Sequence, residues 1–147
     1  MTTILESAPA PAVADGRSFI RLDAVEAAAA QHYGALLVDI RPAALRRLSG
    51  EVPGSLIVAG PVRDWRMEAG EPLRVCEVGP ALEVIVLGDG SSASILAASA
   101  LRGYGVNATD VIGGFPAWAA MRQPVCVGVT RPGRYVDDIN LPCGVSA

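Results

Sequence analysis

The sequence predicts an α/β domain in which a central, mostly parallel sheet is covered by helices on both faces. Short apolar runs without alternation, at residues 36–38 and 84–87, are typical of strands buried on both sides. Segments with helical spacing lie between such runs, and this order produces parallel crossovers. The chain of 147 residues is long enough for one domain with a sizeable core.

The first predicted helix precedes the strand at residues 36–38. Asp23 and Glu26 match a capping box, because the Asp23 side chain can accept from first-turn amides while Glu26 reaches back. Gly34 is expected to end this helix. The expected inward positions follow helical spacing: Leu22, Val25, Ala29 and Tyr33.

A second helix is predicted after that strand. Pro42 suits its first turn, Leu45 and Leu48 are expected to face inward, and Gly50 is expected to end it. Another apolar run at residues 56–58 predicts the next strand.

The second half of the chain repeats the alternation. Residues 62–82 have a weak pattern and are expected to be mostly loop, followed by the clear strand at 84–87. A helix at 94–104, a strand at 108–112 and a short helix at 116–121 complete the predicted order. The expected apolar positions of the longer helix are Ile95, Leu96, Ala98 and Leu101.

We expect three segments along the chain. Residues 1–16 show Ala-Pro steps and no periodicity, which is typical of a flexible leader. Residues 17–123 form the predicted domain, and residues 124–147 form a C-terminal extension.

Composition excludes several function classes. All 12 basic residues are arginines, so lysine Schiff-base chemistry and the lysine-dependent phosphate loop are excluded. The formal charge of −3 and the lack of a basic run argue against nucleic-acid binding. No stretch approaches the ~20 apolar residues of a membrane helix. No signal peptide is evident, so we expect a cytoplasmic protein without a membrane partner.

The three cysteines, Cys76, Cys126 and Cys143, are odd in number and share no C-x-x-C spacing. Neither a disulfide framework nor a zinc site is expected from them. The sequence predicts no metal and no cofactor, and it leaves the oligomeric state open.

The best candidate site is the junction between the strand at 84–87 and the helix after it. In parallel sheets, functional residues gather where strands end at their carboxyl edge. Successive backbone amides in this loop, together with the helix dipole, would form a cradle for an anion. The loop residues are Gly88, Asp89, Gly90, Ser91, Ser92 and Ala93.

The order of motifs resembles the rhodanese-like domain, the fold of sulfurtransferases. The resemblance is carried by Val-Asp-Ile-Arg at 38–41, Gly-Glu-Val-Pro-Gly-Ser at 50–55, the strand, loop and helix at 84–104, and Gly-Gly-Phe-Pro-Ala-Trp at 113–118. It covers about residues 18–125. It implies a single rhodanese-like domain with helices on both faces of its sheet.

The motif residues are expected to be mainly structural. Pro53 and Gly54 suit a turn. Asp39 and Arg41 can hold loops by charge-assisted hydrogen bonds. The remaining motif residues are expected to make a tight turn and a core anchor: Gly113, Gly114 and Trp118.

The sequence departs from the family at the catalytic position. The resemblance places the family's loop cysteine at Gly88 and an arginine at Ala93. Sulfur transfer needs a thiolate that forms a persulfide, and a serine hydroxyl cannot replace it. Asp89 would repel thiosulfate and is expected to satisfy the helix N-terminus instead.

Two functions therefore remain open. The first is a non-catalytic binding or regulatory module in sulfur-related metabolism, with a protein partner held by the 88–93 loop or the 124–147 extension. The alternative is a sulfurtransferase or persulfide carrier that uses Cys143, Cys126 or Cys76. Whether the chain is an enzyme is left open, with the first function favoured.

Two other enzyme classes are ranked lower. A phosphatase of related fold would need the same missing cysteine and arginine. A serine hydrolase is rejected because the loop does not match G-x-S-x-G, and because His32 is expected to contact the terminal carbonyls of its helix.

Overall fold

A four-stranded parallel sheet forms the centre of the computed structural model, which describes residues 19–69 and 71–137. The strands are β2 (Leu36–Asp39), β3 (Leu56–Ile57), β6 (Glu83–Leu87) and β7 (Asn107–Asp110). They lie in the order β3-β2-β6-β7, and every neighbouring pair is parallel. The predicted fold class is confirmed.

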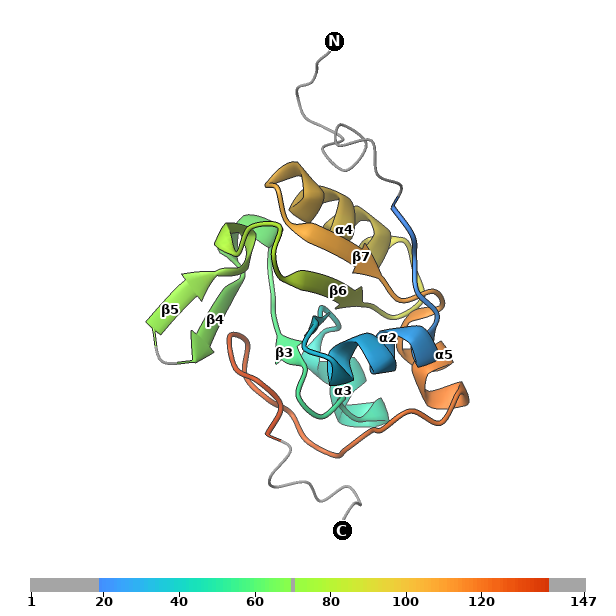
Figure 1. Cartoon of the computed structure of the whole chain (residues 1–147). Coiled ribbons are helices and arrows are strands. Elements are labelled where there is room, and N and C mark those ends of the chain that lie inside the picture. The colour runs from blue at the N-terminus through green and yellow to red at the C-terminus, as the bar shows by residue number, and fades with distance from the viewer. Residues whose placement is uncertain (1–18, 70, 138–147) are drawn as a thin grey trace.

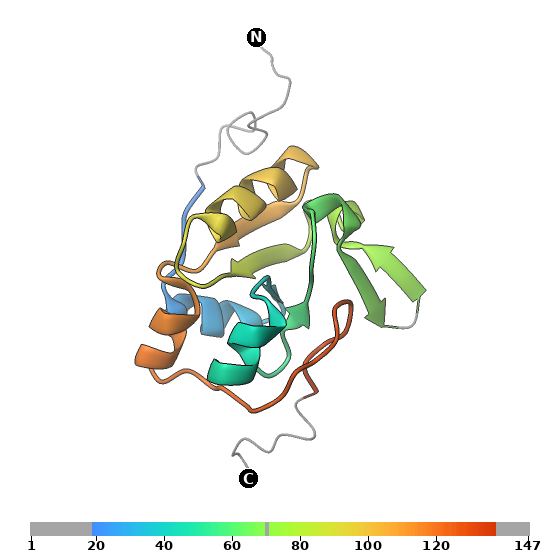
Figure 2. The same cartoon turned by 180° about the vertical axis from the view of Figure 1, so that it is seen from behind.

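Helices cover both faces of this sheet, as Figures 1 and 2 show. Alternate strand residues point to opposite faces, so Val84 and Val86 pack with α4 (Ala93–Gly103), whereas Ile85 and Leu87 pack with α2 (Ala24–His32) and α5 (Gly114–Ala120). β6 therefore contributes to two cores, and this explains its unbroken apolar run.

Both edges of the sheet are covered by segments from the ends of the described chain. Leu22 forms a parallel bridge with Val111 next to β7, and Tyr135 forms an antiparallel bridge with Leu56 in β3. The N–H of Val136 also donates to the carbonyl oxygen of Ser55 at 2.7 Å. These bridges occupy part of each edge, which leaves less of it open to pairing with another chain.

Helix boundaries were predicted better than helix faces. The capping box of Asp23 and Glu26 is present at the start of α2, but Val25 and Tyr33 are 51% and 85% exposed. Ala24 and Ala27 are the buried residues instead. Small side chains on this face let the helix lie close to its neighbours. The hydrophobicity of the residues alone did not indicate that the alanine face is the buried one.

Two further helices show the same error. In α3 (Ala43–Ser49), Leu48 is 83% exposed, whereas Arg46 is the buried residue. In α4, Leu96 is 66% exposed, while Ala98 and Leu101 are buried as predicted. Arg46 can be buried because an acidic side chain, Glu51, lies beside it.

Residues 62–82 were expected to be mostly loop, and this was wrong. They contain the short 3-10 turns η1 (Val62–Asp64) and η2 (Val75–Glu77), and between these the antiparallel hairpin of β4 (Arg66–Ala69) and β5 (Glu71–Arg74). The hairpin projects from the body of the domain in both views (Figures 1 and 2). Its base is fixed by buried Trp65 and Val75, which share a backbone hydrogen bond of 3.0 Å.

The predicted leader, residues 1–16, lies outside the described residues. The predicted extension is described as far as residue 137, and Cys126 and residues 133–136 pair with the rest of the domain. Within the described ranges, no helix is long and apolar enough to cross a membrane.

Candidate functional site

The loop between β6 and α4 lies at a topological switch point of the sheet. From β2 the chain continues to β3 on one side, whereas from β6 it continues to β7 on the other. Ligands in open α/β sheets bind in the crevice at such a point. Asp39 and Leu87, the last residues of β2 and β6, are partners in register there, so Asp39 and the loop start side by side.

Within the loop, the backbone amides are partly satisfied by the loop's own side chains. Asp89 Oδ1 accepts from the N–H of Ser91 at 3.0 Å, and Ser91 Oγ accepts from the N–H of Ala93 at 3.3 Å. We expected Asp89 itself to cap the helix, but Ser91 reaches the first helical residue instead. These two contacts occupy N–H groups that a bound anion would need.

Asp89 adds a negative charge to this loop. Its hydrogen bonds with Ser91, followed by the nearby positive charge of Arg41, hold the pKa of the Asp89 carboxyl below its ordinary value. The carboxylate is therefore ionised at neutral pH. Because the side chain is exposed, it presents this charge to whatever approaches the loop.

The loop backbone packs directly against the start of α5. The carbonyl oxygen of Gly88 accepts from the N–H of Phe115 at 2.8 Å. Gly114 has φ +60°, and a Cβ atom there would lie 2.4 Å from the nitrogen of Gly90. The pair Gly113-Gly114 thus does more than make the predicted tight turn, because it permits backbone contact with the loop.

Gly88, where the resemblance places the family's cysteine, is buried. A Cβ atom on Gly88 would lie 3.1 Å from Cβ of Ser94, so a side chain fits after a small shift of that neighbour. Ser94 is tethered, since its Oγ donates to Asp110 at 2.7 Å. Asp110 also accepts two hydrogen bonds from Arg21, which raise the pKa of that guanidinium.

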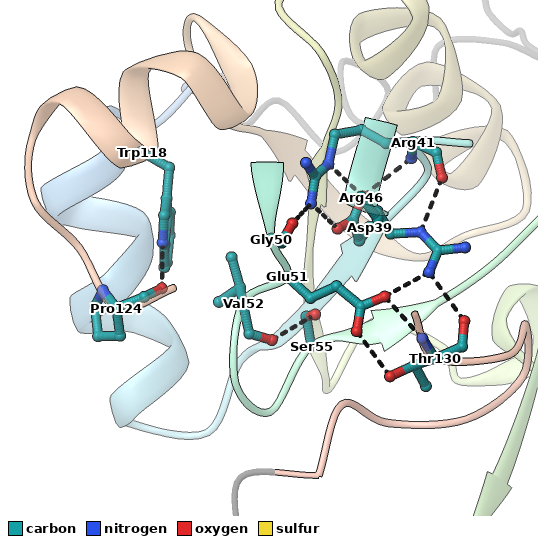
Figure 3. Close-up of polar contacts among 10 residues, drawn as sticks. All are labelled: Asp39, Arg41, Arg46, Gly50, Glu51, Val52, Ser55, Trp118, Pro124 and Thr130. Carbon is teal, nitrogen blue, oxygen red and sulfur yellow. Dashed lines mark hydrogen bonds and ion pairs between the residues drawn. The ribbon is translucent and has the colours of Figure 1, made fainter. Parts of the chain in front are cut away.

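Asp39 and Arg41 form a buried ion pair beside the loop, as their expected structural role requires. Arg41 donates from Nε and Nη2 to the two carboxylate oxygens at 3.0 and 2.7 Å, and from Nη2 to the carbonyl oxygen of Gly50 at 2.9 Å. The guanidinium also stacks on Phe115, 3.8 Å from the ring centre. Figure 3 shows the hydrogen bonds of Arg41 to Asp39 and Gly50. Together with the contact to Phe115, the pair connects β2, α3 and α5.

A second buried ion pair, Arg46 with Glu51, was missed in the sequence. Arg46 Nη1 donates to Glu51 Oε2 at 2.5 Å and to the carbonyl oxygen of Thr130 at 2.9 Å (Figure 3). The Glu51 carboxylate also accepts from the N–H and Oγ1 of Thr130 at 2.9 and 2.8 Å. No local signal could indicate this network, because Thr130 is 79 residues from Glu51.

The other motif residues make contacts within the domain. Trp118 is fully buried, and its Nε1 donates to the carbonyl oxygen of Pro124 at 2.8 Å. Pro53 accepts from Gln31 Nε2 at 3.0 Å. Gly54 has φ +81°, which suits the turn predicted there.

The candidate thiols are not brought to the loop by the contacts of the described residues. Cys126 is 3% exposed and packs with Ile57 and Val136, while its backbone pairs with Glu51. Cys76 is partly exposed in η2, which precedes β6, whereas the loop follows that strand. Cys143 lies outside the described residues.

His32 supports no triad and no metal site. Its ring is exposed and contacts Tyr33 edge to face, with 5.1 Å between ring centres, where we had expected a contact with helix carbonyls. Within residues 19–69 and 71–137, no group of three His, Cys, Asp or Glu side chains could hold a metal ion.

The comparisons with known proteins agree with this architecture. A solved structure from Rhodopseudomonas palustris, described as a protein of unknown function and possible tyrosine phosphatase, is similar with a TM-score of 0.60 and 21% identity. The similarity covers 85% of this chain and 99% of that one. No curated protein sequence matches. The sequence model of the rhodanese-like domain matches residues 23–121, so the chain belongs to the rhodanese-like domain family.

Proposed function

We propose that this protein is a non-catalytic rhodanese-like module that binds a protein partner through its 88–93 loop. The observation that carries the proposal is that Gly88 and Ala93, where the resemblance places the family's reactive cysteine and arginine, have neither a thiol nor a guanidinium. In keeping with the family, we place the module in sulfur-related metabolism in the cytoplasm.

The chemistry of sulfur transfer supports a loss of turnover. A thiolate must attack a sulfur donor and hold the sulfur as a persulfide in an electropositive pocket. In this loop the acidic group Asp89 is held ionised, because its pKa is lowered, and a donor such as thiosulfate is itself an anion. Two like charges in one small site repel each other, so the loop disfavours both the nucleophile and the substrate.

The same features suit recognition of a protein. Asp89, Gly90, Ser91 and Ser92 are exposed, and Ile112, close in sequence to the glycines that contact the loop, is 46% exposed. Backbone contact with Gly114 holds the loop in shape, which lowers the entropy lost on binding. An anionic, preformed loop beside an apolar side chain fits a partner surface with an arginine or lysine near an apolar residue.

Quantitative co-purification from the native source tests this proposal. Asp89→Arg reverses the loop charge and should reduce recovery of a specific partner at least about tenfold, since like charges across an interface are strongly unfavourable. Asp64→Arg is the matched control, because Asp64 is an exposed aspartate outside both the loop and the extension. A variant that lacks residues 138–147 tests the last part of the 124–147 extension as the binding segment.

Partner recovery that survives both a scrambled 88–93 loop and removal of residues 138–147 would contradict binding through the loop and through residues 138–147. Recovery that depends on residues 138–147 alone would move the interface to the extension.

The alternative, a persulfide carrier, rests on one observation in the described chain. Cys76 is partly exposed and so is open to a sulfur donor. Loading on Cys76, Cys126 or Cys143, followed by loss of loading when that cysteine becomes serine, would establish this alternative. Phosphatase chemistry is not proposed for this chain, because it needs the same thiolate and arginine.

A further inference from the structure

A cavity of about 540 Å³ lies at the carboxyl edge of the sheet. Residues that follow β2 and β3, the start of α3, and residues 129–132 of the C-terminal segment form its walls. This edge is where open α/β sheets bind ligands, and the volume is in the range of small-molecule sites.

The cavity has an excess of positive charge. Three arginines line it, Arg41, Arg46 and Arg131, and no acidic residue of the described ranges does so. Asp39 and Glu51 neutralise the first two. Arg131 is exposed and forms no ion pair with the described part of the chain, so one positive charge is left uncompensated.

Arg46 has a buried donor group that the described protein leaves unused. Its side chain is 3% exposed, its Nε donates to the carbonyl oxygen of Arg41 at 3.2 Å, and its Nη1 donates to Glu51 and Thr130. Its Nη2 donates to no described residue and points away from Glu51 and Thr130 in Figure 3. A buried donor without an acceptor is costly, so this group calls for an acceptor from outside the chain.

The rest of the cavity wall is mostly apolar, with Ile40, Val58 and Val129 among its residues. We propose that the cavity binds a small organic carboxylate with a short aliphatic chain. Arg46 Nη2 and Arg131 hold the carboxylate, and the apolar residues cover the chain. An inorganic anion would leave that apolar wall without a partner. The proposal does not depend on the function proposed for the 88–93 loop.

Titration of the full chain with butyrate, followed by amide NMR at constant ionic strength, tests the proposal. Saturable shifts are expected for the amides of residues 58–60 and 129–131. Butyramide has the same chain without the charge and should cause none of them. Equal shifts with butyramide, or shifts that do not saturate, would overturn the proposal, as would binding of inorganic phosphate in preference to butyrate.

Three variants test whether butyrate binding needs the charge of Arg131 and the empty volume of the cavity. Arg131→Gln should weaken butyrate binding about two- to fivefold, which is the effect of one exposed ion pair. Arg134→Gln, three residues away and outside the cavity, should leave it unchanged. Ala43→Leu should abolish binding, because the larger side chain fills the cavity from the first residue of α3. If Arg131→Gln and Arg134→Gln weaken butyrate binding equally, the binding is non-specific electrostatic attraction, and the proposal is contradicted.

Arg46→Lys tests the buried donor itself. The lysine keeps a cation beside Glu51 but lacks the Nη2 group, so butyrate binding should be lost. A thermal melt checks whether the Arg46→Lys variant folds. If it does not fold, the Arg131→Gln and Ala43→Leu variants test the butyrate site in its place.

Discussion

A Cβ atom on Gly114 would lie 2.6 Å from the carbonyl oxygen of Gly88. The start of α5 and the loop after β6 are therefore in backbone contact, and the Phe115 N–H donates to the same oxygen at 2.8 Å. The shape of the loop therefore depends on the glycine at position 114, as well as on the loop's own residues.

Substitution of Gly114 by alanine should be strongly destabilising. The new Cβ must displace backbone atoms, and its residue must keep a positive φ, so we expect a loss of about 2–4 kcal/mol in the free energy of unfolding. Gly105→Ala is the matched control, because Gly105 also has a positive φ, of +87°, but has nothing within 4 Å. It should cost only about 1 kcal/mol. Urea denaturation measures both free energies of unfolding. Equal losses for Gly114→Ala and Gly105→Ala would contradict the backbone contact between Gly114 and the loop.

The ion pair of Arg46 and Glu51 should contribute far more to stability than an exposed pair. Glu51→Gln leaves a buried arginine without its counter-charge, which typically costs about 3–5 kcal/mol. Glu68→Gln is the control, because its partner Arg134 is 3.9 Å away and both side chains are about half exposed. That change should cost at most about 1 kcal/mol.

Hydrogen exchange locates the effect of the same change. Glu51 accepts two hydrogen bonds from Thr130, so Glu51→Gln should speed up exchange of the amides at residues 126–136. Unchanged exchange in that segment would show that the network does not hold it.

The charge of Asp89 gives a prediction about pH. Its pKa is lowered in the folded chain, so ionised Asp89 contributes stability above its unfolded pKa, and this contribution is lost as pH falls through the folded pKa. Since the hydrogen bond of the Ser91 side chain is the largest cause, Ser91→Ala should raise the pKa of Asp89 toward its ordinary value. Ser92→Ala should leave it unchanged. Carboxyl NMR titration measures both, and equal pKa values in the two variants would contradict the assignment to Ser91.

The thiols should differ in reactivity. In the native protein, iodoacetamide should modify Cys76, which is partly exposed, well before Cys126, which is 3% exposed. Mapping by peptide mass spectrometry, with a urea-unfolded sample as control, measures the order. Rapid modification of native Cys126 would show that its packing against Ile57 and Val136 opens readily.

Strand positions could be predicted from the sequence because local pattern decides them. Val84–Leu87 is an unbroken apolar run, and burial on both faces of a parallel sheet requires one. Helix faces were harder, since Arg46 is buried through Glu51 and Leu48 is exposed. The hairpin was missed because charged residues and Pro72 interrupt its strands.

For the candidate site, the order of strand, loop and helix at residues 84–104 could be predicted from the sequence, but the surroundings of the loop could not. The contact between Gly114 and the loop, and the bonds from Thr130 to Glu51, join residues far apart in the chain. Such contacts depend on how the elements pack, and no local spacing encodes them.

The central claim, a rhodanese-like scaffold without its nucleophile, is tested most directly by intact-protein mass spectrometry after incubation with thiosulfate. A thiolate that attacks the outer sulfur of thiosulfate gains one sulfur atom and releases sulfite. We predict no gain for the wild-type chain and a gain, reversed by reductant, for Gly88→Cys combined with Asp89→Ser. A reducible sulfur on wild-type Cys76, Cys126 or Cys143 would contradict the account and identify the protein as a sulfur carrier.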